Sequence, residues 1–318
     1  MHPPLDWLSR LISMMTVRGQ LEIRSSYGAP WVVAYEDANA GEIPYHVILS
    51  GTAVLESPEP GKGQKLSAGD IVMFPHGSRH VLHDGSGIAP APAHHRSDLN
   101  LTFSENTGTG DRLDMLCGRF ILAPPHDRFI RDYLPTRLVV RTSSQNHSSQ
   151  SETSTQLAGL LALMRAESNI SNLGGHAMLN ALSAALFTLT LRMASESNEA
   201  PIGLLALVGH PRLAPALTAM FSNPAHSWTL PELAGLCNMS RATLVRHFQE
   251  KVGRSASDLL TGIRMALAAN ELKKPNASTE VIAEAVGYQS LAAFRRAFSQ
   301  HMNMTPGEWR RLSHPKVD

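Results

Sequence analysis

The amino-acid sequence predicts an α+β protein in three parts: an N-terminal β-barrel, a helical middle segment and an all-helical C-terminal domain. Short β-branched or aromatic runs bounded by Gly, Pro and Ser occupy residues 1–142, which are typical of a small barrel or sandwich. An apolar stripe with helical spacing lies in residues 152–222. Residues 223–312 contain one helical pattern twice. At 318 residues the chain is long enough for two domains of ordinary size.

Composition separates the C-terminal third from the rest of the chain. Residues 1–210 carry 15 Lys and Arg against 19 Asp and Glu, whereas residues 211–318 carry 13 against 8. A basic excess confined to the repeat fits a phosphate-bearing partner. The two cysteines, Cys117 and Cys237, fall in different predicted domains, so no disulfide framework is expected and a reducing cytoplasm fits best. The start of the chain shows no export signal, and residues 177–193 are too short and too polar for a membrane span.

Four runs predict strands in the N-terminal part. They cover residues 31–35, 45–49, 52–55 and 70–74. Residues 86–110 are rich in Pro, Ala, His and Gly, which predicts a mobile polar loop.

The middle segment is predicted to form two helices separated by Gly174-Gly175. Its apolar residues recur at steps of 3, 4, 3 and 4, as Leu179, Leu182, Leu186, Leu189 and Met193. Such a stripe fits a helix packed on its own barrel, and it equally fits a helix–helix seam between two subunits of a homodimer. The serine-rich stretch 143–154 before these helices is expected to be a flexible connection.

The C-terminal repeat predicts two helix-turn-helix motifs. The first copy contains Leu233, Ala234, Asn238, Ser240, Leu244, Arg246 and Phe248. The second contains Ile282, Ala283, Gly287, Ser290, Phe294, Arg296 and Phe298, at offsets of 49 and then 50 residues. Residues 256–274 between the copies suit one helix that ends before Pro275 and holds the motifs at a nearly fixed separation. The second helix of such a motif usually enters the major groove of double-stranded DNA.

Side chains expected on the outer side of these second helices are the candidates for base contacts. They are Arg241, Ala242, Val245, Arg246 and Gln249 in the first copy, and Leu291, Ala292, Arg295 and Arg296 in the second. Arginine can bond guanine in a bidentate manner, glutamine can bond adenine, and small apolar groups can touch a thymine methyl. Candidates for phosphate contacts are Ser240, Arg254, Ser255, Ser290, Thr305 and Arg310.

The C-terminal residues resemble a known family. Trp228 to Ala234, Gly253, Tyr288, Pro306 and Trp309-Arg310, together with the repeated residues, are similar to the AraC/XylS family of bacterial transcription regulators. Ala256 and Asn303 depart from the family pattern, where proline and glycine are usual. The resemblance implies a cytoplasmic, nucleoid-associated protein that binds promoter DNA and usually activates transcription through RNA polymerase.

The N-terminal part resembles a cupin barrel. Gly69, Pro75, His76, Gly77, His80 and Asp84 are spaced as in the second cupin motif, whereas the first motif retains only His46. With Cys117, the histidines His46 and His80 are expected to form a site for a metal ion or a small-molecule effector. The alternatives are a cysteine of the core and satisfied barrel histidines. The resemblance extends through His210-Pro211-Arg212-Leu213 to cupin-type sensors, including redox-responsive members, but residues 24–28 lack the second cysteine of those members.

Two classes of function therefore compete. The sequence favours an effector- or stress-responsive DNA-binding regulator that is not an enzyme. The alternative is a cupin-type metal-dependent dioxygenase or isomerase with a helical tail, and the incomplete first motif disfavours it because such enzymes need three or four ligands.

Overall fold

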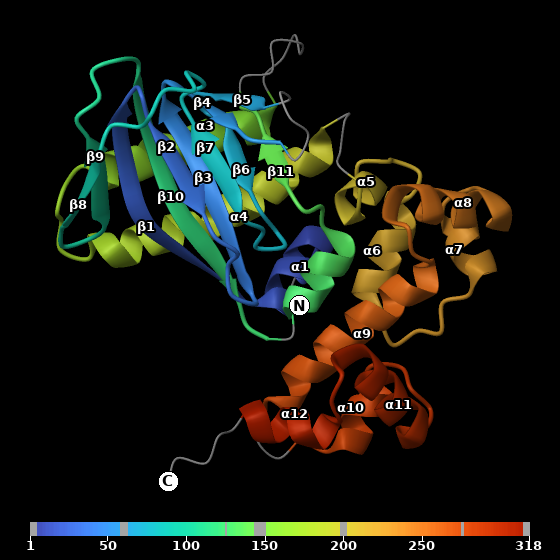
Figure 1. Cartoon of the computed structure of the whole chain (residues 1–318). Coiled ribbons are helices and arrows are strands. Elements are labelled where there is room, and N and C mark those ends of the chain that lie inside the picture. Colours follow the sequence, from blue (N-terminus) through green and yellow to red (C-terminus); the bar gives the residue numbers. More distant parts are fainter. Residues whose placement is uncertain are drawn as a thin grey trace. The chain divides into compact units, whose positions relative to one another are not determined.

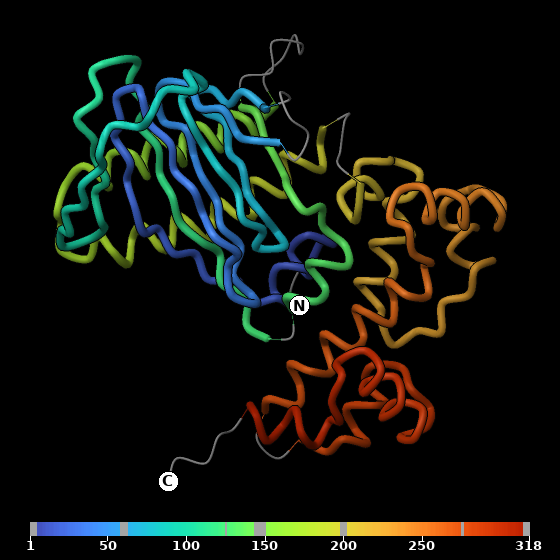
Figure 2. The backbone as a smooth tube through the Cα atoms, in the orientation of Figure 1, coloured from blue at the N-terminus to red at the C-terminus, as the bar shows by residue number. Residues whose placement is uncertain are grey.

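The computed structural model describes residues 5–57, 63–124, 126–142, 151–197, 202–274 and 277–313. The chain forms two compact units, each assembled from separate segments. The barrel unit comprises residues 17–122 and 135–197, and the helical unit comprises residues 1–16, 123–134 and 198–318. Figures 1 and 2 show the elements and the path of the chain. The units differ from the expected division because the two middle helices fold with the barrel.

Two sheets build the barrel unit. The larger contains, in spatial order, β11 (Leu138–Val140), β6 (Ile71–Met73), β3 (Glu42–Ser50), β10 (Arg112–Leu122), β1 (Val17–Gly28), β9 (Thr102–Asn106) and β8 (Ala93–Ser97). The smaller contains β2 (Val32–Tyr35), β7 (His80–His83), β4 (Thr52–Leu55) and β5 (Gln64–Ser67). The four predicted strands are all present. The predicted loop 86–110 is wrong in part, because β8 and β9 form an antiparallel pair within it.

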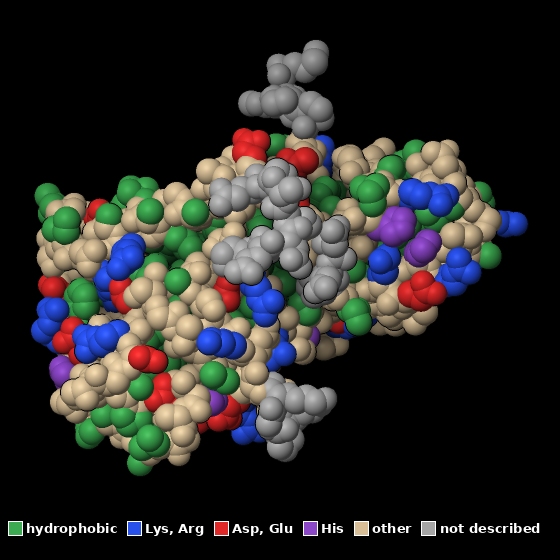
Figure 3. All heavy atoms as spheres, turned by 90° about the horizontal axis from the view of Figure 1, so that it is seen from above, with side chains coloured by type: hydrophobic (Ala, Val, Ile, Leu, Met, Phe, Trp, Pro, Cys, Tyr) green, Lys and Arg blue, Asp and Glu red, His purple; other side chains and the backbone are tan. Residues whose placement is uncertain are grey.

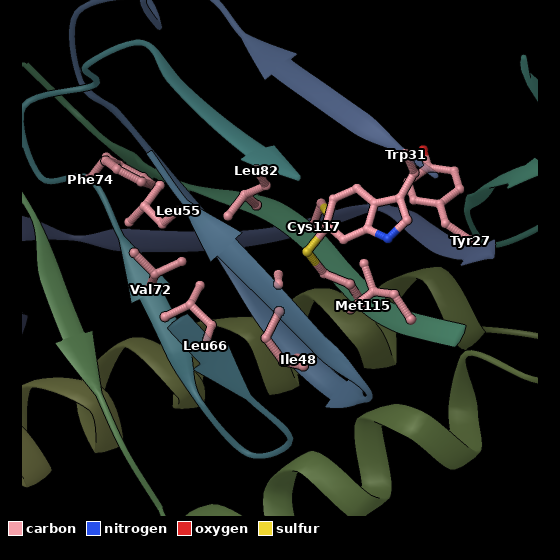
Figure 4. Packing of buried hydrophobic residues seen from close by; sticks show 12 residues of the cluster. Tyr27, Trp31, Ile48, Leu55, Leu66, Val72, Phe74, Leu82, Met115 and Cys117 are labelled. Carbon is pink, nitrogen blue, oxygen red and sulfur yellow. The ribbon is translucent and has the colours of Figure 1, made fainter. Parts of the chain in front are cut away.

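The core of this unit lies between the sheets, where alternating side chains of both meet (Figure 4). Its buried members are Tyr27, Trp31, Ile48, Ala53, Leu55, Leu66, Val72, Phe74, Leu82, Leu113, Met115 and Cys117. The alternative that Cys117 is a small core residue is therefore confirmed.

Helices α3 (Glu152–Glu167) and α4 (Gly175–Glu196) lie on one side of the larger sheet (Figure 1). Residues 168–174 separate the two helices, and the predicted breaker Gly174-Gly175 lies at the start of α4, with Gly174 as its N-cap. Ser151 caps α3, and residues 143–150 of the serine-rich stretch lie outside the described residues. Leu179, Leu182 and Leu186 are buried, so the stripe packs on the barrel. The hydroxyl groups of Tyr45 and Ser183 lie 2.7 Å apart and fix α4 against β3. α4 is long and apolar enough to cross a membrane, yet it is a packed helix of this unit.

The described residues of the second unit form helices and no strand. The helices are α1 (Trp7–Met15), α2 (His126–Tyr133), α5 (Leu204–Val208), α6 (Ala214–Ser222), α7 (Leu230–Leu236), α8 (Arg241–Val252), α9 (Ala256–Leu272), α10 (Thr279–Ala285), α11 (Leu291–Met302) and α12 (Pro306–Ser313). The predicted helix before Pro275 is α9, which runs between the two helix-turn-helix subdomains (Figure 1). The sequence analysis did not predict α1 and α2, and both pack on α9. Asn270 of α9 contacts both helices: its side chain donates to the Met14 carbonyl of α1 and lies 3.0 Å from Nε2 of His126 on α2.

Candidate nucleic-acid interface and sensor cluster

The first helix-turn-helix is built by local signals. A capping box between Thr229 and Glu232 begins α7, and Asn238 takes the left-handed conformation (φ 50°) in the turn. Ser240 then caps α8 by accepting from the Thr243 amide. Leu244 and Phe248 are fully buried, as their spacing predicts. The predicted base-reading side chains of this helix are all exposed: Arg241, Ala242, Val245, Arg246 and Gln249.

The second motif repeats this construction in α10, α11 and the turn at Gly287 (φ 86°). Ser290 caps α11, and Phe294 and Phe298 are buried. Ala292, Arg295 and Arg296 are exposed, as a groove-entering helix requires. The predicted outward position of Leu291 is wrong, because its side chain packs against the core of this subdomain. Figure 3 shows Lys and Arg side chains on the surface of the helical unit, at the right of the view.

The structure separates the phosphate candidates into two groups. Four are exposed residues at helix N-termini, where free amides favour anions: Ser240, Ser255, Ser290 and Thr305. The two arginines have internal partners instead. Arg254 forms an ion pair with Asp132 of α2, and Arg310 donates to the carbonyl of Ala277 before α10. A phosphate contact by either arginine stays a prediction, and it would require the side chain to exchange or share its internal partner.

Residues that precede the first helix-turn-helix hold α8 and its turn in place, and the sequence analysis did not identify these contacts. The Gly203 amide donates to the Lys251 carbonyl near the end of α8 at 2.7 Å, and Arg212 donates to the Asn238 carbonyl in the turn at 2.7 Å. Between them, the ring of His210 lies 5.1 Å from that of His247 on α8. The His210-Pro211-Arg212-Leu213 string was the available signal: its Arg212 bonds the turn before α8 and its His210 lies beside His247, whereas the bond near the end of α8 comes from Gly203, outside the string.

The sensor candidates come together as two register pairs facing each other across the barrel. His46 pairs with Cys117 on neighbouring strands of the larger sheet, and Tyr35 pairs with His80 in the smaller sheet. The Nε2 atoms of His46 and His80 lie 2.7 Å apart, and Phe74 stacks on His80. Tyr35 was missed; it donates to Cys117 Sγ at 3.4 Å and its ring packs on both histidines. We call Tyr35, His46, His80 and Cys117 the sensor cluster.

Hydrogen bonding fixes the tautomers of the two histidines. Nδ1 of His80 lies 2.8 Å from the Ser78 carbonyl, which can only accept, so Nδ1 carries the proton. Nε2 of neutral His80 therefore accepts, and Nε2 of His46 donates. Nδ1 of His46 is then a bare acceptor, buried and without a partner among the described residues. Burial lowers the pKa of His46 well below its usual value and lowers that of His80, so both are neutral at pH 7.

The donor set does not fit a three-ligand metal site. Only two imidazoles converge, and the thiol of Cys117 is engaged by Tyr35. Among the residues that the structure describes, no group of three or more His, Cys, Asp or Glu side chains could hold a metal ion. Burial raises the pKa of Cys117 to about 11, so the thiol is protonated at pH 7 when no metal is bound. The three side chains lie close together without forming a set of three metal ligands, and binding of an effector or metal at His46, His80 and Cys117 stays a prediction.

Family models match both the N-terminal and the C-terminal part of the chain. A family model described as Cupin matches residues 6–196, more than half of the chain, and a model described as Helix-turn-helix domain matches residues 233–312. A solved DNA-binding transcriptional dual regulator from Escherichia coli K-12 is 32% identical, covering 31% of this chain and 89% of its own, with a TM-score of 0.30.

Relatives match along nearly the whole chain. An uncharacterized HTH-type transcriptional regulator of Haemophilus influenzae is 29% identical, covering 96% of this chain and 99% of its own. The RCS-specific HTH-type transcriptional activator RclR of Escherichia coli is 28% identical, covering 96% and 97%. Because the relatives are regulators over their full length, the dioxygenase or isomerase alternative is set aside. The chain belongs to the cupin family and, with its C-terminal helix-turn-helix domain, is an AraC-like transcription regulator that binds double-stranded DNA and is not an enzyme.

Proposed function

We propose that this regulator reads its operator through α8 and α11, with Arg246 and Arg296 contacting guanines in successive major grooves. The observation that carries the proposal is that both arginines are exposed at equivalent places on two capped helices whose phenylalanine faces are buried. The weak Arg246–Glu250 pair, at 3.8 Å, leaves the guanidinium free to exchange a surface carboxylate for a base edge. Ser240, Ser255, Ser290 and Thr305 would hold phosphates and set the register.

Binding to DNA selected from a random library tests this proposal. Arg246→Ala and Arg296→Ala should each cost roughly 1 to 3 kcal/mol on the selected site and relax specificity at one base pair. Arg112→Ala is the matched control, since Arg112 is an exposed arginine of the barrel unit. Equal losses on selected and random DNA would show that the two arginines hold phosphates, and the proposal would fail.

The protein is further proposed to work as a homodimer joined through α3 and α4. One face of α3 exposes Ala158, Gly159, Ala162 and Leu163, and one face of α4 exposes Ala177, Met178, Ala181 and Ala185. These positions recur at helical spacing and carry no charge, so two helices could approach closely there. Ala181→Arg should halve the mass measured by light scattering, whereas Ala93→Arg, at an exposed alanine of β8, should not. A wild-type monomer at all concentrations refutes the dimer.

The sensor cluster is the proposed point at which a small-molecule effector acts. With the effector bound, the protein would activate transcription by recruiting RNA polymerase. It would do so in the cytoplasm, at the nucleoid. Support comes from the unpartnered Nδ1 of His46, which offers a buried acceptor to a donor group, and from the similarity to RclR, an RCS-specific activator. His46→Ala and His80→Ala should abolish the transcriptional response while DNA binding persists. Unchanged responses, together with no metal in tag-free protein, would exclude both an effector and a metal at this cluster.

A further inference from the structure

Arg264, in the middle of α9, contacts both helix-turn-helix subdomains. Toward the first, it donates to three successive carbonyls of the loop before α7: Nε to Pro224 at 2.7 Å, and Nη2 to Ala225 at 3.4 Å and His226 at 3.0 Å. Toward the second, its guanidinium lies over the ring of Tyr288 in the turn of that motif, 5.6 Å from the centroid. One side chain therefore joins the entrance of the first subdomain to the turn of the second.

Gly287 brings the backbones of the two subdomains together at the same point. It has φ 86°, a conformation that L side chains rarely adopt. A Cβ placed on it would lie 2.3 Å from the Ala225 carbonyl oxygen and 2.8 Å from Nη2 of Arg264. The turn of the second motif thus touches the loop leading to the first, and α9 is not the sole connection between them.

The chemistry of this junction requires arginine. A guanidinium is planar and carries five donors in a fixed fork, so it can bond several carbonyls while its face stacks on an aromatic ring. A lysine ammonium has the same charge but is a point donor without a flat face. Arg264 is also half-buried, which separates it from the exposed arginines of α8 and α11.

We propose that Arg264 is a positioning residue that locks the two reader helices at one separation and rotation, so that the protein accepts one spacing between its half-sites. The proposal rests on the proposed function, since both α8 and α11 must read DNA. Each added base pair moves a half-site along the duplex by about 3.4 Å and turns it by about 35°. If α8 and α11 are held at a fixed separation, they cannot both contact half-sites that an inserted base pair has displaced. If α9 alone joins them, α9 can bend and both helices can still bind.

The test compares spacing penalties. Operator DNA is selected with the wild-type protein, and dissociation constants are measured on the selected site and on a version with one base pair inserted between the half-sites. For the wild type we expect the insertion to weaken binding about tenfold or more. For Arg264→Ala and Arg264→Lys we expect weaker binding at the native spacing but an insertion penalty of about threefold or less.

Two further variants separate positioning from folding. Tyr288→Leu removes the ring on the second subdomain while the carbonyl contacts remain, so it should also flatten the spacing penalty. Arg212→Ala removes a bond inside the first subdomain and should weaken binding by the same factor at both spacings. A full wild-type penalty in Arg264→Lys and Tyr288→Leu overturns the proposal. A wild-type protein that selects no sequence, or one indifferent to Arg246→Ala and Arg296→Ala, contradicts the proposed function instead.

Discussion

At the residue scale, the sensor cluster shows how burial sets the chemistry of a histidine pair. His46 and His80 are buried on facing sheets, and their pKa values are lowered because the cationic form loses its hydration. The same burial leaves Nδ1 of His46 without a donor among the described residues. Their charge states therefore couple the stability of the barrel unit to pH.

Acid should destabilise the barrel unit through this pair. Above pH 6.5 both imidazoles are neutral whether folded or unfolded; below it, the unfolded chain takes up protons that the folded barrel resists, so the free energy of unfolding falls toward the lowered pKa values. Between pH 7 and 5, wild-type protein should lose about 2 kcal/mol more than His46→Gln. Urea unfolding followed by the fluorine signal of 5-fluorotryptophan at Trp31, the single tryptophan in the barrel unit's sequence, measures this difference. Parallel pH profiles would contradict it.

Cys117 should be unreactive in the folded protein. Burial raises its pKa to about 11, and the hydrogen bonds from Tyr35 and Ser25 only partly offset that rise. In a Cys237→Ser background, iodoacetamide at pH 7.5 should label Cys117 at least about a hundredfold more slowly in native than in urea-unfolded protein. Comparable rates in the two states would mean that the barrel opens readily and that this thiol can sense oxidants.

At the element scale, the packing of α4 on β1 depends on a glycine. A Cβ on Gly19 would lie 2.2 Å from the Ala184 backbone nitrogen, a distance that no side-chain rotation can relieve. The Leu21 amide, two residues on, donates to Asn180 of α4. The helix and strand thus meet backbone to backbone.

Gly19→Ala should lower the free energy of unfolding of the barrel unit by about 2 kcal/mol or more. Gly235→Ala is the matched control inside α7: a Cβ placed there would meet none of the described atoms beyond its own turn of helix within 4 Å, and better helix propensity should stabilise the helical unit by about 0.5 to 1 kcal/mol. Denaturant titrations of the two variants measure both signs. The same small effect from both substitutions would show that α4 can move away from β1 without cost.

Elements with strong local signals were predictable from the sequence. The caps Ser240 and Ser290 and the buried residues four apart fixed both helix-turn-helix motifs. The strand β8 could not be predicted, because all its side chains are exposed and it has no alternation to reveal its pairing with β9. The helix α1 had an unused signal in Asp6, whose side chain caps it, ahead of buried Leu8 and Leu11.

At the scale of the whole molecule, the chain passes between the two units four times, near residues 16, 122, 134 and 197. Segments so distant in sequence join one unit through tertiary contacts, such as Asn270 with Met14 and Arg254 with Asp132. Composition and periodicity carry no information on such contacts. For that reason the sequence indicated the sensor residues His46, His80 and Cys117 but neither Tyr35 beside them nor the internal partners of Arg254 and Arg310.

Guanine methylation protection on the selected operator tests most directly the central claim that α8 and α11 read one duplex together. Dimethyl sulfate attacks guanine N7 in the major groove, the atom that a bidentate arginine covers. Wild-type protein should protect two groups of guanines about 10 base pairs apart, Arg246→Ala should lose one group, and Arg296→Ala should lose the other. Protection of both groups in both variants, or a single protected group in the wild type, would contradict the claim.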